Sequence, residues 1–318
     1  MDKRGIWMPA LGRKRALAQH LKSSISEILT GPEPYQLLGT DASESSPNAD
    51  SVDFWEMAPM SGDDFFLEWA NGFCQKFSVT HIVPTRDAEM ALWARWKEGS
   101  VFGEIQVIVS NQSLMKSWFG KEAAAKWLDE SGLPHPGWKT SFNEVDFTEG
   151  VWIAKPTFGS ASRGVSVLGS REEAEACLNR AVDPIGFQHY ITGPEYTVNL
   201  YFDPRGQCQA IIPHQRIETL NGEVSRGVTV EDSDLLDLGN RFARATYGNA
   251  RGPINFQAIR CEKTSELQIT DINPRFGGGY PLTHKAGGRF TDWLCQEFVL
   301  GASGRDYSWR AGVEFTRA

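Results

Sequence analysis

The residues best suited to chemistry in this sequence are Asp271, Asn273 and Arg275, which stand two positions apart. In an extended strand alternate side chains share a face, so Asp271 and Asn273 would follow Leu267 and Ile269 on one face. Asp271 offers a carboxylate and Asn273 an amide oxygen, a pair suited to Mg²⁺, which completes its shell with phosphates and water. Arg275 adds a fixed cation within reach of the same phosphates. The spacing predicts a metal and phosphate site at the end of a strand.

The segment before this stretch supplies a third oxygen. Residues 254–260 have a strand pattern, and the polar run 262–266 is typical of a turn. A hairpin centred on Thr264 would place Gln257 directly opposite Asp271. The alternative is an ordinary hairpin whose Asp and Asn only begin a loop, and the rest of the chain has to distinguish the two.

Length, charge and cysteine content limit the class of protein. The chain has 318 residues, enough for two or three packed units, and its formal charge of −8 argues against a nucleic-acid surface. We expect no membrane span, because no apolar run approaches about 18 residues, and no signal peptide, because the N-terminus lacks an apolar h-region. Five cysteines occur without C-x-x-C spacing, which favours a reducing cytoplasm over a disulfide framework.

The N-terminal part of the chain alternates strand and helix patterns, which predicts a parallel sheet of the Rossmann type. A lone Gly12 follows the first strand in place of G-x-G-x-x-G, so a dinucleotide site does not follow. Asp87 could N-cap a helix, and PTRD at 84–87 would then lie where a strand meets a helix, a common place for ligand-binding loops. The expected strands are 5–8, 35–39, 79–84 and 107–110, and the expected helices are 13–22 and 87–97.

A small-residue loop at 159–164 lies between two β-rich runs, which excludes the usual P-loop followed by a helix. The loop could still hold phosphates through backbone N–H groups, the hydroxyls of Ser160 and Ser162, and Arg163, with Lys155 on the incoming strand. A plain flexible hairpin is the alternative.

The remaining elements follow from periodicity and capping signals. Lys121 begins a predicted helix over 121–131, where a cation opposes the helix dipole, so it is either solvated or faces an anion. Ser170 and Glu173 have the spacing of a capping box for a helix that ends near 180. Further strands are predicted at 187–191, 195–203 and 210–213, then a polar loop at 216–226 and a helix that ends near Gly248.

The order of these motifs resembles the ATP-grasp superfamily, most closely its branch related to carbamoyl-phosphate synthetase large-subunit domains. The most specific element is DINPRFGGGYPL at 271–282, which is similar to that branch's E-[IV]-N-P-R-x-G-G-G-x-P-L. Before it come GK at 120–121, KPTFGSASRGV at 155–165 and GPEYTV at 193–198, and PTRD resembles the close of the pre-grasp domain. The resemblance covers nearly the whole chain.

The resemblance implies a fold and its division. The fold would combine α/β and α+β parts, with ATP clamped between two α+β lobes. Residues 1–112 would form a Rossmann-like pre-ATP-grasp domain, 113–190 the linker helices and the lid subdomain, and 191–318 the C-terminal grasp subdomain with the Mg-ATP site. A cytoplasmic homodimer is the state that the resemblance implies.

The resemblance also implies the site residues. Arg275 and Lys155 would be catalytic, because they would steady the transferred phosphoryl group. Gln257, Asp271 and Asn273 fall on the family's Mg²⁺ positions, with Mn²⁺ as the alternative ion. The ATP site would consist of two lysines on the phosphates (Lys121 and Lys155), a lid loop (Ser160, Ser162, Arg163 and Gly164), an adenine hinge (Gln188, His189, Tyr190 and Ile191) and a ribose contact (Glu195).

Three positions depart from the family pattern. Gly120 replaces an acidic residue, Gln188 replaces a frequent Glu, and Asp271 is one methylene shorter than the usual Glu. With one carboxylate among three proposed ligands, Mg²⁺ would depend heavily on ATP oxygens.

The resemblance implies an ATP-dependent carboxylate–amine ligase. A substrate carboxylate would take the γ-phosphoryl group, and an amine would attack the acyl phosphate to give an amide or peptide bond, ADP and phosphate. Both substrates would be small molecules, such as amino acids, and neither nucleic acid nor a membrane is expected as a partner. A carboxylate or carbamate kinase that stops at the acyl phosphate and a non-catalytic ATP sensor stay open. His214, Arg216, Arg226 and His284 could orient substrate or be structural.

Overall fold

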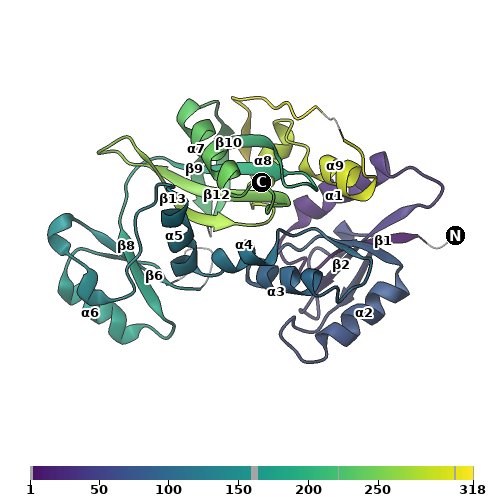
Figure 1. Ribbon diagram of the computed structural model, residues 1–318, viewed down its shortest axis with the longest axis horizontal. Coiled ribbons are helices and arrows are strands. Elements are labelled where there is room, and N and C mark those ends of the chain that lie inside the picture. The colour runs from purple at the N-terminus through teal and green to yellow at the C-terminus, as the bar shows by residue number, and fades with distance from the viewer. Residues whose placement is uncertain (1–2, 159–163, 221, 304–305, 318) are drawn as a thin grey trace.

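Three β-sheets organise the computed structural model, which describes residues 3–158, 164–220, 222–303 and 306–317. In Figure 1 the sheet of the N-terminal part lies at the lower right, a small sheet lies at the lower left, and the largest sheet lies across the top. Helices α4 (Gln112–Ser117) and α5 (Lys121–Glu130) lie between them (Figure 1).

The N-terminal sheet has five parallel strands in the order β3-β2-β1-β4-β5, which confirms the predicted parallel arrangement. Strand β3 and helix α2 were not predicted. The elements are β1 (Arg4–Met8), α1 (Arg15–Ile28), β2 (Tyr35–Asp41), a 3-10 turn (Ala49–Ser51), β3 (Phe54–Met57), α2 (Phe66–Lys76), β4 (Val79–Ile82), α3 (Asp87–Glu98) and β5 (Gln106–Val107).

The small sheet has three antiparallel strands in the order β7-β6-β8. Ser170 caps its helix, because its hydroxyl accepts from the Glu173 N–H at 3.3 Å. The Glu173 carboxylate accepts from the Gly169 N–H at 2.7 Å, one residue before the position that a capping box requires. The elements are two 3-10 turns (Phe142–Glu144 and Phe147–Glu149), β6 (Trp152–Pro156), β7 (Ser166–Leu168), α6 (Arg171–Arg180) and β8 (Ile185–His189).

The largest sheet has six antiparallel strands in the order β13-β12-β9-β10-β11-β14. The predicted polar loop at 216–226 is wrong: β10 runs on to Leu220 and pairs with β11, which begins at Glu223. The elements are β9 (Glu195–Phe202), β10 (Cys208–Leu220), β11 (Glu223–Thr229), α7 (Ser233–Ala245), β12 (Gly252–Arg260), β13 (Leu267–Asn273), α8 (Tyr280–Lys285), α9 (Phe290–Leu294), a π-helical turn (Cys295–Val299) and β14 (Glu314–Thr316).

Apolar packing joins the two larger sheets. One core cluster runs from Trp7 and Trp93 of the N-terminal part to Phe242 and Phe256 over the six-stranded sheet. A second cluster joins α1 to α8 and α9. The small sheet has a core of its own around Trp152 and Phe187. The small sheet is therefore a separately packed lobe beside the larger body that the other two sheets form.

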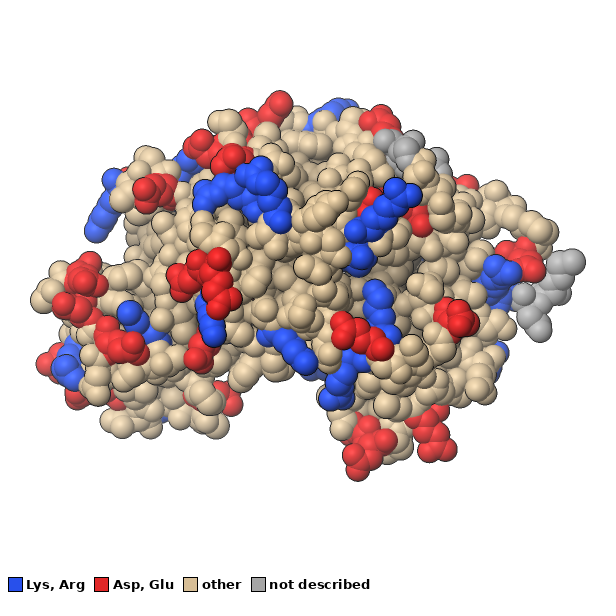
Figure 2. Space-filling model, in the orientation of Figure 1, with Lys and Arg blue, Asp and Glu red and all other residues tan. Residues whose placement is uncertain are grey.

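The surface charges are mixed, and the helices are short. Figure 2 shows acidic and basic side chains interspersed over one face of the molecule. None of the helices in the described ranges has the length and apolar character that crossing a bilayer requires.

Candidate active site

The hairpin of β12 and β13 places the predicted metal-binding side chains. Gln257 lies opposite Asp271, as the sequence predicted. The register shifts by one residue beyond this pair, so Thr270 is the extra residue of a β-bulge. The predicted alternation is therefore wrong at this point, because Ile272 rather than Asp271 continues the apolar cluster of Leu267 and Ile269.

Asp271 is a half-buried carboxylate among cations. Burial raises its pKa, and the positive charges of Lys121, Lys155 and Arg275 oppose that shift. Asp87, a second carboxylate, raises the pKa further. Lys121 comes from helix α5, Lys155 from strand β6, and Arg275 follows β13. Three separate segments of the chain therefore meet at this carboxylate.

Arg275 is fixed by several hydrogen bonds. Its Nε donates to Asp87 Oδ2 at 2.9 Å, its Nη1 to the Phe276 carbonyl at 2.8 Å and its Nη2 to Asn273 Oδ1 at 3.2 Å. Burial lowers the pKa of Arg275, but the Asp87 carboxylate more than offsets this, so the pKa is raised. The guanidinium is therefore held charged, in one orientation, beside the predicted metal-binding oxygens.

Asp87 is a site residue that the sequence interpretation missed. The prediction that it N-caps α3 is wrong, because the helix begins at Asp87 itself and its carboxylate contacts Arg275 instead. Its other oxygen, Oδ1, is buried and has no hydrogen-bond partner among the described residues. The PTRD motif signalled a ligand loop, but nothing in the sequence links it to a residue 188 positions away.

Lys121 lies at the start of α5 and lines a cavity of about 390 Å³, which we call the central cavity. The prediction that this lysine begins a helix is confirmed. Side chains from all three sheets or their connections line the central cavity: Arg86 and Asp87 before and in α3, Lys121, Phe158 after β6, and Asp271 and Asn273 of β13.

Gly120 departs from the family pattern for a reason visible in the backbone. Its φ of +92° lies in the region that favours glycine, and a Cβ there would stand 2.8 Å from the Phe158 ring. An acidic side chain could not occupy this position without moving the aromatic ring.

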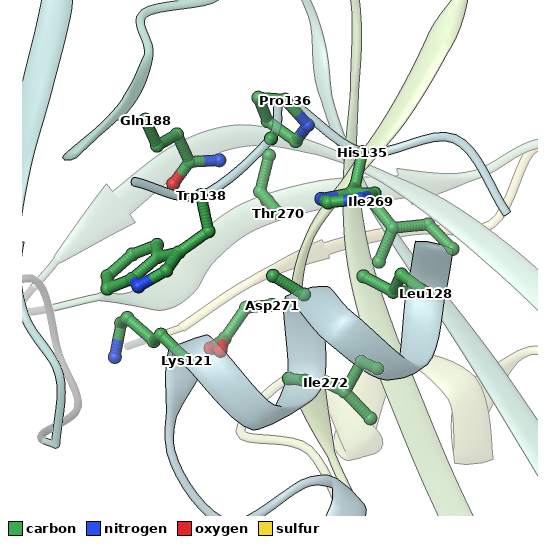
Figure 3. Close-up of a pocket in the computed structure, with 13 residues that line it drawn as sticks. Lys121, Leu128, His135, Pro136, Trp138, Gln188, Ile269, Thr270, Asp271 and Ile272 are labelled. Carbon is green, nitrogen blue, oxygen red and sulfur yellow. The ribbon is translucent and has the colours of Figure 1, made fainter. Parts of the chain in front are cut away.

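A second, smaller space of about 30 Å³ adjoins the central cavity and shares Lys121 and Asp271 with it. We call it the inner cavity. Figure 3 shows Gln188, Trp138, Lys121 and Asp271 around one side of it and the apolar Leu128, Ile269 and Ile272 around the other. Trp138, another residue that the sequence interpretation missed, has a buried indole N–H without a partner among the described residues.

Lys155 extends from β6, and its amine is half-buried. Burial lowers its pKa, the carboxylates of Asp271 and Glu195 oppose the shift, and Lys121 adds to it. Glu195 at the start of β9 also pairs with Arg216 at 3.0 Å. The structure thus brings Lys155, Lys121, Glu195 and Asp271 into one electrostatic group.

The predicted adenine hinge is only partly at the cavities. Gln188 is buried and lines the inner cavity. His189 instead stacks on Trp152 at 3.9 Å and approaches Glu149 at 3.5 Å, while Tyr190 is exposed and Ile191 is half-buried in the connection to β9. These three line neither the inner nor the central cavity in the described part of the chain.

The predicted lid loop is described only at its end. Gly164 has a φ of +69° and lines a different space, with Pro156 and Cys177. Ser160, Ser162 and Arg163 lie outside the described residues.

The residues considered for substrate orientation fall into two groups. His214 is fully buried against Gly279, with an unpartnered Nε2, and burial lowers its pKa to about 3, so it is neutral. Arg216 pairs with Glu195, near Lys155. Arg226 is paired on the surface with Glu218, and His284 stacks on His20 at 3.8 Å, which gives both a local structural contact.

A model of the ATP-grasp domain matches residues 120–279, just over half of the chain. The chain belongs to the ATP-grasp family. No curated protein shows a significant match to the sequence. The family segment begins at Gly120 and ends at Gly279, so it includes the lysines, the bulged hairpin and the glycine run described above.

Solved structures share the ATP-grasp fold across nearly the whole chain. N5-carboxyaminoimidazole synthetase from Staphylococcus aureus, complexed with ADP, is 13% identical, with a TM-score of 0.74 over 95% of this chain and 78% of that one. The biotin carboxylase domain of Hydrogenobacter thermophilus 2-oxoglutarate carboxylase, complexed with MgADP, ADP and bicarbonate, is 16% identical, with a TM-score of 0.73 over 96% and 72%. L-amino acid ligase from Bacillus licheniformis is 14% identical, with a TM-score of 0.70 over 93% and 74%.

Proposed function

We propose that this chain is an ATP-dependent carboxylate–amine ligase that forms an amide or peptide bond through an acyl phosphate. The observation that carries the proposal is the grouping of Lys121, Lys155 and Arg275 around the half-buried Asp271, beside the central cavity. Arg275 is also paired with Asp87, and Glu195 lies near Lys155, so cations and carboxylates alternate around the site. Cations that converge from separate segments on one point suit the phosphates of ATP and the charge that develops during phosphoryl transfer.

ATP would lie along the two adjoining cavities. Lys121 and Lys155 would contact its phosphates in the central cavity, with residues 160–164 as the lid loop. The apolar side chains and Gln188 around the inner cavity suit adenine, which is larger than this space of about 30 Å³, so the side chains around it would have to move apart on binding. Glu195 would lie near the ribose. Membership of the ATP-grasp family and the ADP complexes of its structural neighbours support this placement.

The donors at the end of β13 fit Mg²⁺, with Mn²⁺ as the alternative. Asp271 is a carboxylate whose ionised form burial disfavours, so a cation beside it would relieve that penalty. Asn273 Oδ1 accepts one hydrogen bond from Arg275, and an amide oxygen has a second lone pair. Gln257, Asp271 and Asn273 would hold the ion, which would shield the negative charge of the phosphates.

The chemistry needs no protein nucleophile. A carboxylate oxygen of the acid attacks the γ-phosphorus, and the bond to the ADP oxygen breaks. Arg275 and Lys155 offset the charge on the transferred group. The amine nitrogen then attacks the carbonyl carbon, loses a proton, and expels phosphate as the carbon–oxygen bond breaks. The backbone at Gly277, Gly278 and Gly279 can approach the reacting carbonyl because no side chain stands there.

The division of the chain and its setting complete the proposal. Each proposed unit, 1–112, 113–190 and 191–318, contains one of the three sheets. We propose a cytoplasmic enzyme that acts as a homodimer on small-molecule acids and amines, such as amino acids.

ADP release from Mg-ATP tests this function. Small acids and amines are supplied first singly and then in pairs, and hydroxylamine is added as a general amine that converts an acyl phosphate to a hydroxamate. Turnover that requires one acid together with one amine or hydroxylamine supports the ligase. Full turnover with the acid alone supports the kinase, and ATP binding without turnover in any pair supports the sensor.

A further inference from the structure

Two more cavities continue from the central cavity toward the N-terminal sheet. The first, of about 210 Å³, lies between α1 and the residues after β13, and we call it the junction cavity. It shares Arg86 and Asp87 with the central cavity. The second, of about 380 Å³, lies beyond it and shares Lys14 and Arg86 with the junction cavity; we call it the sheet-edge cavity. The three spaces therefore form a row that starts at the proposed phosphate site.

The sheet-edge cavity lies at the carboxyl ends of the parallel strands. Pro9 and Ala10 follow β1, and Thr40 and Asp41 end β2. The chain changes direction between β1 and β4 in the strand order, and the crevice beside such a switch point is where open parallel sheets bind ligands. Met60 and Phe66 give it an apolar wall, and Asp41, Arg86 and Glu89 give it charged groups.

Lys14 and Arg86 are the cations shared by these two cavities, and Lys14 is the more buried of them. Its Nζ donates to the Ala10 carbonyl at 3.2 Å, and no carboxylate of the described residues lies within ion-pair distance of it. Burial lowers its pKa, the positive charge of Arg275 adds to the shift, and Asp87, Asp41 and Glu223 oppose it from a distance. A half-buried ammonium group without a counter-ion is costly, which indicates a role beyond folding.

Three of the neighbouring cations are paired: Arg275 contacts Asp87, Arg86 contacts Glu89 at 3.0 Å, and Arg317 contacts Glu223 at 2.5 Å. Arg13, which also lines the junction cavity, is exposed to solvent. Lys14 thus differs from Arg13 in being half-buried, and from the other three cations in having no carboxylate partner among the described residues. An anion placed beside Lys14 would also lie next to Arg275 and Gly277, on the path to the central cavity.

We propose that Lys14 binds the carboxylate of the acid substrate in the junction cavity, and that the sheet-edge cavity holds the body of that acid. The substrate is then a small carboxylic acid whose body has an apolar face toward Met60 and Phe66 and a polar group toward Asp41 and Glu89, oriented with its carboxylate toward ATP. This assignment rests on the proposed function, because it takes the central cavity as the place of the γ-phosphate. Lys14 is a positioning and specificity residue and takes no part in bond formation.

Competitive chemical labelling tests the subsite without relying on turnover. The full-length protein is treated with trinitrobenzenesulfonate, which reacts with unprotonated amines, and the labelled lysines are measured by peptide mass spectrometry. The panel of competitors consists of Mg-ATP, acetate, lactate, succinate and the standard amino acids. Lys22 lies in α1, which begins just after Lys14, and is paired with Asp53 at 2.8 Å; it is the internal control.

We expect at least one acid of the panel, at a saturating concentration, to slow the labelling of Lys14 by about tenfold. Mg-ATP alone should slow the labelling of Lys155 and leave Lys14 and Lys22 unchanged. Protection of Lys14 by Mg-ATP alone, or protection by no acid of the panel, would overturn the assignment.

A kinetic experiment separates this subsite from the ligase itself. Lys14→Met should raise KM for the acid by about tenfold or more and leave KM for ATP within about twofold, whereas Lys14→Arg should recover part of the loss and Lys22→Met should change neither. If the wild-type protein turns over and Lys14→Met leaves KM for the acid unchanged, the subsite fails and the ligase stands. If an acid protects Lys14 but no pair supports turnover, the ligase fails and the subsite stands.

Discussion

Lys155 and Asp271 carry opposite charges. Burial lowers the pKa of Lys155 and raises the pKa of Asp271, so in each case it favours the neutral form. The charge of each opposes the pKa shift of the other, so both depend on the same electrostatic group. We expect Lys155→Ala and Asp271→Ala to abolish turnover while thermal unfolding stays within a few degrees of wild type. Activity close to wild type in either variant would remove that residue from the mechanism.

The direction of the Lys155 pKa shift gives a pH prediction. A lysine with a lowered pKa loses its charge at a lower pH than an ordinary lysine, so kcat/KM for ATP should fall on an alkaline limb that lies below the usual lysine range. Lys155→Arg keeps a charge over that range and should move the limb to higher pH. An alkaline limb at the same pH in both proteins would assign it to another group.

The pair of Arg275 and Asp87 separates binding from catalysis. Arg275→Ala should lower kcat more than it weakens ATP binding, because the guanidinium acts mainly on the transferred group. Asp87→Asn keeps the size of the side chain but frees Arg275 to reorient, and it should lower kcat by about tenfold or more. ATP affinity is measured by calorimetric titration. Equal losses in kcat and in ATP affinity would instead give both residues a binding role.

At the scale of single elements, Gly120 shows why a motif position can depart from its family. The residue combines a φ of +92° with the Phe158 ring where a Cβ would lie. Gly120→Ala should lower the free energy of unfolding by about 1–3 kcal/mol and perturb the neighbouring Lys121. Gly62→Ala is the control, since nothing lies within 4 Å of its Cβ position. Equal stability of the two variants would contradict this account.

Helix α3 carries a buried lysine that gives a stability prediction. Burial lowers the pKa of Lys97 to about 8, and its Nζ donates to the Val109 carbonyl at 2.8 Å. Above pH 8 the folded state loses this proton before the unfolded state does, so stability relative to Lys97→Met should rise with pH, by at most about 3 kcal/mol up to pH 10. Lys126→Met, at an exposed position, should show no such trend in urea unfolding.

The elements also show what the sequence could and could not reveal. The pairing of Gln257 with Asp271 agrees with the prediction, but the turn alone does not produce it. Next to the turn Arg260 pairs with Leu267, a register that would place Gln257 opposite Thr270. The bulge at Thr270 brings Asp271 there instead, and no residue type in the sequence marks that bulge. The strand over 216–220 was mistaken for a loop because its side chains are polar and mostly exposed, so it lacks the apolar alternation of a half-buried strand.

At the scale of the whole molecule, the order of sheets was predictable from the order of motifs, and the family match confirms the ATP-grasp fold. The contacts between distant segments were not. Asp87 meets Arg275 across 188 positions, and the charge of the same arginine acts on Lys14, just before the first helix. Neither contact has a local signal, because each depends on how the N-terminal sheet packs against the six-stranded one.

The transfer of oxygen between substrates tests the central claim of an acyl-phosphate ligase most directly. The acid identified by ADP release is labelled with ¹⁸O in its carboxylate and incubated with Mg-ATP and its amine, and the phosphate product is analysed by mass spectrometry. An acyl phosphate predicts one ¹⁸O atom in phosphate for each amide formed, because the carboxylate oxygen that attacks phosphorus leaves with it. Amide formation with unlabelled phosphate would contradict the account.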